Sequence, residues 1–285
     1  MSTRWFEVRV AAVTREPIEL RFPRPSVMGI VNVTPDSFSD GGLHFGDPEA
    51  AAASARAMVE AGAAIVDLGG ESTRPGADGV SLDEELRRVV PVLERLDGVP
   101  VSIDTAKAEV ARQALALGAE LVNDVTALRG DPELAGVVAD SGAYLCLMHM
   151  QGEPRSMQRN PVYEDVVSEV TAFLEERLRA AVDAGVPEEQ ICLDPGIGFG
   201  KTVDHNLELL RNLDVVARLG RPILVGVSRK SSLGRLLGDA GATRGTLAAS
   251  LGAAVSAFAH GATIFRVHDV REHVEALTIA AAVEG

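Results

Sequence analysis

The stretch VMGIVNVTPDSFSDGG, residues 27–42, decides how the rest of the chain is interpreted. It begins with an apolar run, Val27–Val31, which is typical of a strand buried on both faces. The run breaks at Asn32 into a polar loop that ends in glycine, and a helical pattern follows from Asp47-Pro48. This order of strand, polar loop and helix recurs seven more times before the C-terminus, so the unit predicts the fold.

Eight such units predict parallel strands joined by right-handed helical crossovers. They fit a single α/β domain of the (β/α)8 TIM-barrel class over residues 25–285, with a doubly wound open sheet as the competing architecture. No linker or low-complexity segment divides this range. The expected strands are Val27–Val31, Ile65–Leu68, Val101–Ile103, Leu121–Val122, Tyr144–Leu147, Ile191–Leu193, Ile223–Val225 and Ile264–Val267.

Helix start and stop signals divide the intervening chain. Ser81 and Glu84 form a capping-box pattern, and Thr105 is expected to cap the helix that ends at Gly118. The expected helices cover about 48–62, 82–96, 106–118, 132–142, 164–184, 207–219, 231–237, 246–259 and 270–283.

The N-terminal 24 residues stand apart from the repeating units. FEVRV at 6–10 and IELRF at 18–22 alternate apolar and polar residues around a turn-like TREP, which predicts a β-hairpin extension over 1–24 that covers the bottom of the barrel. No signal peptide or apolar run long enough for a bilayer is present, so we expect a cytoplasmic protein. Cys146 and Cys192 lie in apolar runs without a CxxC pattern and are expected to be buried free thiols.

The charge balance limits the classes of partner. The net charge is −14, from 41 acidic and 27 basic residues, which excludes nucleic acid and anionic membranes as main partners. A local cluster of cations can still bind a small anion. Aromatic residues make up only 4% of a chain that is 46% hydrophobic, so the core is expected to consist of alanine, valine, leucine and isoleucine.

Cationic side chains follow several of the expected strands, at the end of the barrel where (β/α)8 proteins carry their chemistry. Together with two hydroxyl donors they predict an anion site, most simply for phosphate. The alternative is a rim of structural salt bridges. The set comprises Thr73, Arg74, Arg229, Lys230, Ser231, Arg266 and His268.

A second set combines acids and an amide. Asp104, Asn123 and Asp194 each follow or end a strand, and Lys230 is shared with the first set. Carboxylates accept from amino and ring N–H groups while lysine donates to an oxo group, so these residues match a pterin or guanine edge. The alternative for Asp104 is a simple helix N-cap.

Several motifs do not support other chemistries. GIGFGKT at 196–202 fails as a phosphate loop because Pro195 stands where glycine is needed, and its GxGxG spacing is not that of a dinucleotide fold. We interpret its glycines as letting backbone approach a flat ligand, with Phe199 as one wall. The histidines lack zinc-site spacing, and we interpret His149 as orienting a loop. A Schiff base on Lys230 remains an alternative.

Eight motifs, in order, resemble dihydropteroate synthase of the folate pathway: MGIVNVTPDSFSDGG, DLGGESTRPGA, VSIDT, LVNDV, LMHMQG, DPGIGFGKT, GVSRKS and FRVHDV. The likeness runs from about Pro25 to the C-terminus. It implies a transferase that joins 6-hydroxymethyl-7,8-dihydropterin pyrophosphate to p-aminobenzoate and releases pyrophosphate, with Mg2+. It also implies a homodimer, and sulfonamides as inhibitors that mimic p-aminobenzoate.

The resemblance also implies the site residues. Those for the pterin are Asp104, Asn123, Met148, Asp194, Phe199, Lys230 and Arg266. Those for pyrophosphate are Asn32, Thr73, Arg74, Arg266 and His268, with Asn32 also at Mg2+. Those for p-aminobenzoate are Phe38, Thr73, Arg74, Pro75, Phe199, Lys230 and Ser231. The catalytic set is Asn32, Asp104, Lys230, Arg266 and His268.

The implied reaction needs no strong base. An electron-rich dihydropterin can stabilise the cation left when pyrophosphate departs, so an SN1-like path is expected, with loops 32–46 and 69–80 closing over the site. Two alternatives use the same pterin residues. One is a methyltransferase that moves a methyl group from methyltetrahydrofolate to a corrinoid, and the other is a paralogue that binds pterin without turnover.

Overall fold

The computed structural model describes residues 25–34, 46–73, 76–153 and 155–284, so the expected hairpin and its extension over 1–24 lie outside it. Within the described ranges, parallel strands form one eight-stranded sheet in the order β6-β5-β4-β3-β2-β1-β8-β7. The strands are β1 Ser26–Asn32, β2 Ile65–Gly69, β3 Val101–Asp104, β4 Leu121–Asp124, β5 Tyr144–Met148, β6 Ile191–Asp194, β7 Leu224–Val225 and β8 Ile264–Val267.

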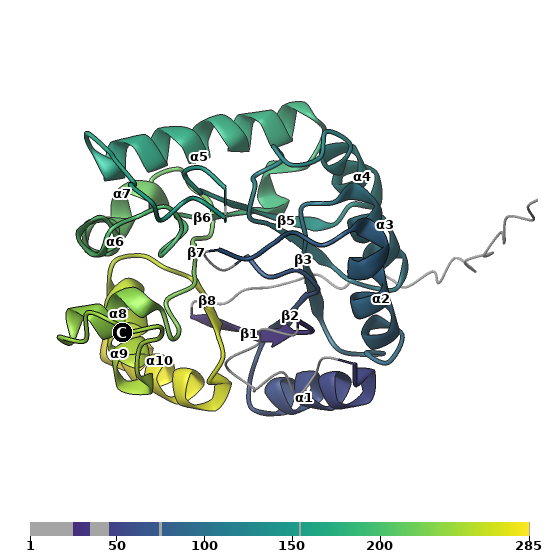
Figure 1. Ribbon diagram of the computed structural model, residues 1–285, viewed down its shortest axis with the longest axis horizontal. Coiled ribbons are helices and arrows are strands. Elements are labelled where there is room, and N and C mark those ends of the chain that lie inside the picture. Colours follow the sequence, from purple (N-terminus) through teal and green to yellow (C-terminus); the bar gives the residue numbers. More distant parts are fainter. Residues whose placement is uncertain (1–24, 35–45, 74–75, 154, 285) are drawn as a thin grey trace, which may run out of the picture.

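The sheet closes into a barrel where its two outermost strands meet. A single isolated parallel bridge joins Leu193 of β6 to Ile223, directly before β7. Around the ring the strands follow one another in chain order, and β8 pairs with β1, whereas a doubly wound sheet reverses its strand order. The (β/α)8 barrel is therefore confirmed, and the open-sheet alternative is wrong (Figure 1).

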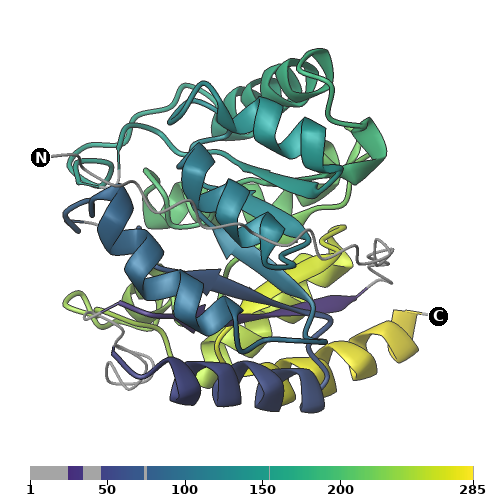
Figure 2. The same ribbon diagram turned by 90° about the vertical axis from the view of Figure 1, so that its right-hand side faces the viewer.

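Helices surround the strands on the outside of the barrel (Figure 1). Figure 2 shows that α1 and α10 run along the same flank, where the turn at Gly62 lies against Val274. The helices are α1 Pro48–Glu60, α2 Leu82–Leu93, α3 Ala108–Ala116, α4 Leu134–Ser141, α5 Val166–Asp183, α6 Val203–Arg211, α7 Leu213–Ala217, α8 Ser231–Leu236, α9 Leu247–Ala259 and α10 Val270–Glu284, with a 3-10 turn at Glu188–Gln190.

Two expected helices were placed wrongly. The stretch at 207–219 begins earlier, at Val203, because Thr202 and His205 form a reciprocal capping box, and it breaks at Asn212 into α6 and α7. The helix after β3 starts at Ala108, because the Thr105 hydroxyl accepts a hydrogen bond from the backbone N–H of Lys107 instead of capping a helix.

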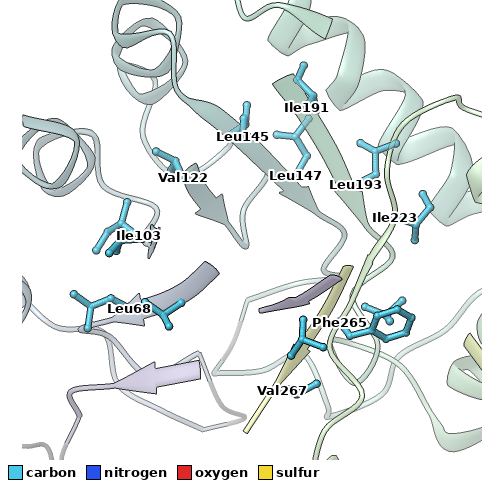
Figure 3. Packing of buried hydrophobic residues seen from close by; sticks show 14 of the residues in the cluster. Leu68, Ile103, Val122, Leu145, Leu147, Ile191, Leu193, Ile223, Phe265 and Val267 are labelled. Carbon is cyan, nitrogen blue, oxygen red and sulfur yellow. The ribbon is translucent and has the colours of Figure 1, made fainter. Parts of the chain in front are cut away.

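The apolar core has two layers. The outer layer fills the space between strands and helices, where Figure 3 shows the side chains of Leu68, Ile103, Val122 and Phe265 among others. The inner layer closes the bottom of the barrel with one residue from each of seven strands. Its members are Met28, Ile65, Leu121, Cys146, Cys192, Leu224 and Ile264.

Both cysteines are buried and free, as expected, and they face each other in register on β5 and β6. Within the described ranges, no helix has the length and apolar character needed to cross a bilayer.

Candidate active site

A cavity of about 870 Å3 opens at the C-terminal ends of the strands. Its walls bring together residues from β1, β3 and β8, from α6 and α8, and from seven loops that are far apart in the sequence. Among the predicted site residues, it is lined by Asn32, Thr73, Asp104, Phe199, Lys230, Ser231, Arg266 and His268.

Six predicted residues are not part of this lining. Asn123, Met148 and Asp194 end their strands at the same side of the barrel but are buried. The remaining three, Phe38, Arg74 and Pro75, lie outside the described residues.

Strand register sets the first wall of the site. Asn32 pairs with Gly69, Gly69 with Asp104, and Asp104 with Asn123 along β1 to β4. A Cβ atom added at Gly69 would lie 3.5 Å from Asn32 Oδ1 and 3.6 Å from the Asp104 Cβ. The missing side chain at Gly69 therefore leaves the space between the Asn32 and Asp104 side chains open.

Arg266 reaches from β8 to two acids on this wall. Its Nε donates to Asp67 Oδ2 at 2.5 Å, and its Nη2 donates to Asp104 Oδ2 at 2.9 Å. Asp67 also accepts from Ser102 Oγ at 2.6 Å and from Asn123 Nδ2 at 3.1 Å. Asp104 is therefore not an N-cap, and that alternative is wrong.

Burial changes the acidity of the site carboxyls. It raises the pKa of Asp104, an effect that the Arg266 guanidinium opposes and the Asp67 carboxylate reinforces. Burial also raises the pKa of Asp194 to about 6, although the Gly196 N–H, which donates to it at 2.7 Å, and the Lys230 charge favour the ionised form. Buried acids with shifted pKa values beside cations are typical of a functional site.

Lys230 and Phe199 form a second part of the cavity wall. The Lys230 Nζ lies 4.3 Å from the centroid of the Phe199 ring, within range of a cation–π interaction. Phe199 also packs on the cluster that contains Met148. An aromatic ring and a cation therefore line the cavity, and the buried Met148 thioether belongs to the cluster against which the ring packs.

The glycines of 196–202 serve a purpose that differs in part from the expected one. Gly196 has φ +68°, and a Cβ there would lie 1.9 Å from the His149 carbonyl oxygen. A Cβ at Gly200 would lie 2.5 Å from the Gln151 carbonyl oxygen. Both glycines therefore allow close packing against the neighbouring loop, and only Gly198 lies against Lys230.

Lys201 fixes this loop from inside. Its Nζ lies 2.9 Å from His149 Nδ1 and donates to the carbonyl oxygens of Gly196 at 3.0 Å and Phe199 at 2.9 Å. Burial lowers the pKa of Lys201 to about 7 and, with the Lys201 charge, lowers that of His149 to about 3. Our interpretation of His149 as a loop-orienting residue agrees with these contacts.

The predicted cations separate into two kinds. Arg229 forms a two-point ion pair with Asp269, with Nε–Oδ2 at 2.9 Å and Nη2–Oδ1 at 2.5 Å, so the salt-bridge alternative is right for this residue. His268 is held by Ser228, whose Oγ lies 3.1 Å from its Nδ1 and accepts from its backbone N–H. Lys230, Arg266 and His268 line the cavity together with Arg229, and the lining also includes Lys201, Arg235 and Arg244.

A third ionic cluster holds the loop after β2. Lys107 pairs with Glu71 and with the fully buried Glu85, whose Oε2 lies 2.5 Å from its Nζ. Glu71 Oε1 also accepts from the backbone N–H of Val80 at 3.2 Å. One carboxylate therefore ties the two ends of the loop that carries Thr73.

The pterin binding enzyme family matches residues 28–268 of the sequence. The chain belongs to this family. Curated relatives within it include the dihydropteroate synthase of Neisseria meningitidis serogroup C, 49% identical over 91% of this chain and 93% of the relative. The dihydropteroate synthase of Escherichia coli K12 is 47% identical over 92% of this chain and 93% of the relative.

Solved structures of these pterin-binding enzymes agree with the fold. That of Yersinia pestis dihydropteroate synthase in a sulfonamide complex has a TM-score of 0.87 and 46% identity, covering 93% of this chain and 96% of its own. That of the Xanthomonas albilineans enzyme with 7,8-dihydropteroate has a TM-score of 0.80 and 45% identity over 93% and 96%. The family resemblance seen in the sequence is confirmed, and the chain is a transferase of the dihydropteroate synthase kind.

Four side chains of this pterin-binding enzyme make contacts that the sequence analysis did not predict. Ser102 and Asp67 lie inside their strands, below the strand ends that were searched. The available signal was an acid in the otherwise apolar run IVDLG. Ser228 and Lys201 lie in recognised motifs, but their contacts depend on residues 40 and 52 positions away.

Proposed function

We propose that this protein condenses 6-hydroxymethyl-7,8-dihydropterin pyrophosphate with p-aminobenzoate to give 7,8-dihydropteroate and pyrophosphate in folate synthesis. The observation that carries the proposal is one cavity in which Asp104 faces the cations Lys230, Arg266 and His268. Acids can accept from the pterin N–H groups, while the cations can hold its oxo group and the pyrophosphate. The related enzymes were solved with a sulfonamide, 4-aminobenzoate and 7,8-dihydropteroate.

The pterin would enter between the two walls. Asp104, Asn123 and Asp194 would accept from its amino and ring N–H groups, and Lys230 would donate to its oxo oxygen. Arg266 would stack on one face of the ring. Met148 would pack beneath it, and Phe199 would close the side toward p-aminobenzoate. Each hydrogen bond with a charged partner contributes roughly 1.5–3 kcal/mol.

Reaction would follow an SN1-like path. The bond from the exocyclic methylene carbon to the pyrophosphate oxygen breaks, and its electron pair leaves with pyrophosphate. Arg266, His268 and Thr73 would stabilise the departing charge, with Arg74 from outside the described residues. The aniline nitrogen then bonds to the methylene carbon and loses its proton to water. No side chain is needed as a strong base.

The residues at the cavity fit Mg2+ only when pyrophosphate is present. No group of three or more His, Cys, Asp or Glu residues in the described ranges could hold a metal ion. Asn32 would supply one oxygen ligand, and pyrophosphate and water would supply the others, as is usual for Mg2+. Bound in this way, Mg2+ would neutralise charge on the leaving group.

The p-aminobenzoate would lie at the outer part of the cavity. Ser231 begins α8 directly after Lys230, so a hydroxyl and a cation are available to its carboxylate. Thr73 lines the same cavity, and Phe38, Arg74 and Pro75 would complete the subsite from outside the described residues. Sulfonamides would compete here because they share the aniline group.

We also propose that the protein is a cytoplasmic homodimer paired through α9. This helix contains no charged residue, and Gly252 and Val255 lie on its exposed side. A helix without a polar face is usually covered. A Val255→Glu variant should shift the molar mass measured by light scattering from dimer to monomer, and an unchanged mass would contradict this interface.

The function is tested by measuring pyrophosphate release with and without p-aminobenzoate, together with chromatography of dihydropteroate. Stoichiometric formation of both products supports the proposal. Binding of pterin without release would indicate a non-catalytic paralogue, and methyl transfer from methyltetrahydrofolate to a corrinoid protein would indicate the methyltransferase. Asp194→Ala and Lys230→Ala should each weaken pterin binding in calorimetry, and unchanged affinity in both would contradict the site.

A further inference from the structure

Asp67 is a buried carboxylate to which the reaction proposed above gives no role. It lies in the middle of β2, two residues before Gly69 at the strand end, and it is fully buried. It does not line the cavity, so it cannot touch a substrate there. An acid in such a position requires partners, because burying an unpaired carboxylate is costly.

Three donors from three other strands converge on this carboxylate. Ser102 Oγ of β3 donates to Oδ1 at 2.6 Å. Arg266 Nε of β8 and Asn123 Nδ2 of β4 both donate to Oδ2, at 2.5 Å and 3.1 Å. Two of the three donors therefore belong to predicted pterin ligands, and both share the same oxygen.

The contact with Asp67 fixes the plane of the Arg266 guanidinium. Nε is held by Asp67 and Nη2 by Asp104 at 2.9 Å, so two separate points of the planar group are restrained. A guanidinium held at two points cannot rotate about its last bonds, and its flat face keeps one direction. A pterin ring that stacks on this face then meets a surface that is already in place.

The same carboxylate decides which end of the Asn123 amide is used. Because Nδ2 donates to Asp67, the amide oxygen is the end left for a ligand. Asn123 is thereby set as an acceptor for a pterin N–H group. Without Asp67, the amide could turn over and present its NH2 group to a donor of the ligand.

We propose that Asp67 is a positioning residue for pterin recognition, which holds the Arg266 plane and the Asn123 amide orientation from beneath the cavity. The inference rests on the proposed pterin site. It predicts that Asp67 affects affinity for the pterin substrate and leaves the p-aminobenzoate subsite unchanged.

The main test is Asp67→Asn. An asparagine has the same volume, and its oxygen can accept from Arg266 and Asn123 while its NH2 group donates to Ser102 Oγ. The change therefore removes the charge and weakens the hold on the guanidinium with little change in packing. We expect the dissociation constant for the pterin pyrophosphate to rise by about tenfold or more, and KM for p-aminobenzoate to stay within about twofold.

Ser102→Ala is the matched control at the same carboxylate. It removes only the bond to Oδ1, so Arg266 and Asn123 keep their contacts with Oδ2. Stability should fall, but pterin affinity should stay within about threefold of wild type. If Asp67→Asn also keeps pterin affinity within threefold while wild type shows full turnover, the inference is wrong and the proposed function stands.

A second measurement uses the unaltered protein, so that it does not depend on folding of a variant. In arginine labelled with nitrogen-15, the Nε–H resonance of Arg266 is identified by its loss in Arg266→Lys. We expect this proton to be protected from exchange with water both without ligand and with the pterin bound. Rapid exchange in either state would overturn the proposal.

Discussion

Removing Lys107 should destabilise the barrel through Glu85, a buried carboxylate that does not line the cavity. Lys107 Nζ lies 2.5 Å from Glu85 Oε2 and also pairs with Glu71. Glu85 is fully buried, and its other oxygen has no hydrogen-bond partner among the described residues. Burial acts to lower the pKa of Lys107, but the two carboxylates raise it above its usual value.

The magnitude follows from what remains after Lys107→Met. Glu71 has a side chain that is 26% exposed, so water can replace its lost partner. Water cannot reach Glu85, which would keep a buried charge without a counter-ion, at a cost of about 3–5 kcal/mol in the free energy of unfolding. Loss of the tie between Glu71 and Lys107 should also loosen the loop that carries Thr73 and raise KM for p-aminobenzoate.

Urea denaturation followed by circular dichroism gives the free energy of unfolding for each variant. Arg218→Met is the matched control, because Arg218 pairs with Asp214 on an exposed helix at 3.1 Å and should lose less than about 1 kcal/mol. Adding Glu85→Gln to Lys107→Met removes the stranded charge and should recover at least half of the loss. The reasoning is refuted if Lys107→Met costs no more than Arg218→Met, or if Glu85→Gln recovers nothing.

Three further predictions concern the loop at 196 and the site acid beside it. Gly196→Ala should lower the free energy of unfolding by more than about 3 kcal/mol, because the added Cβ would lie 1.9 Å from the His149 carbonyl oxygen. Gly220→Ala is the control, because Gly220 has φ +77° and no atom within 4 Å of the added Cβ, and it should cost about 1 kcal/mol. Thermal unfolding measures both. Lys201→Met should lower the free energy of unfolding by at least about 2 kcal/mol, because buried acceptors on Gly196 and His149 lose their donor; an unfolding curve like that of wild type would contradict this role. Pterin affinity should fall as pH drops through about 6, where the raised pKa of Asp194 converts its carboxylate to the neutral acid, and calorimetry of Asp194→Asn should show no such step.

Most of the fold was predictable because one signal repeats. Each strand is a short apolar run that ends in a polar residue or glycine, and the alternation with helices leaves few topologies. The errors in helix boundaries occurred where a threonine could either cap a helix or bond within a turn or loop. Thr105 resembles a helix cap but binds the N–H of Lys107 in a turn, and the cap at Thr202 was hidden inside a motif that we interpreted as a loop.

The site was predictable at the strand ends and not beneath them. Asp104 and Arg266 could be assigned to one mouth because the barrel brings strand ends together. Arg266 contacts Asp67, 199 residues away in the sequence, and Asp104, 162 residues away. These contacts depend on the direction of the side chains, which hydrophobic periodicity does not report. The same limit applies to Glu85, whose partner Lys107 is 22 residues away and on another element.

The seam of the barrel lies between two of the residues proposed to bind the pterin. β6 and β7 meet through a single bridge, between Leu193 and Ile223, whereas the other neighbouring strands share longer ladders. Asp194 immediately follows Leu193 on one side of this seam, and Lys230 lies seven residues after Ile223 on the other side. A bound pterin that contacts both Asp194 and Lys230 would link the chain on either side of the single bridge between β6 and β7. Ligand binding and closure of the barrel would therefore stabilise each other.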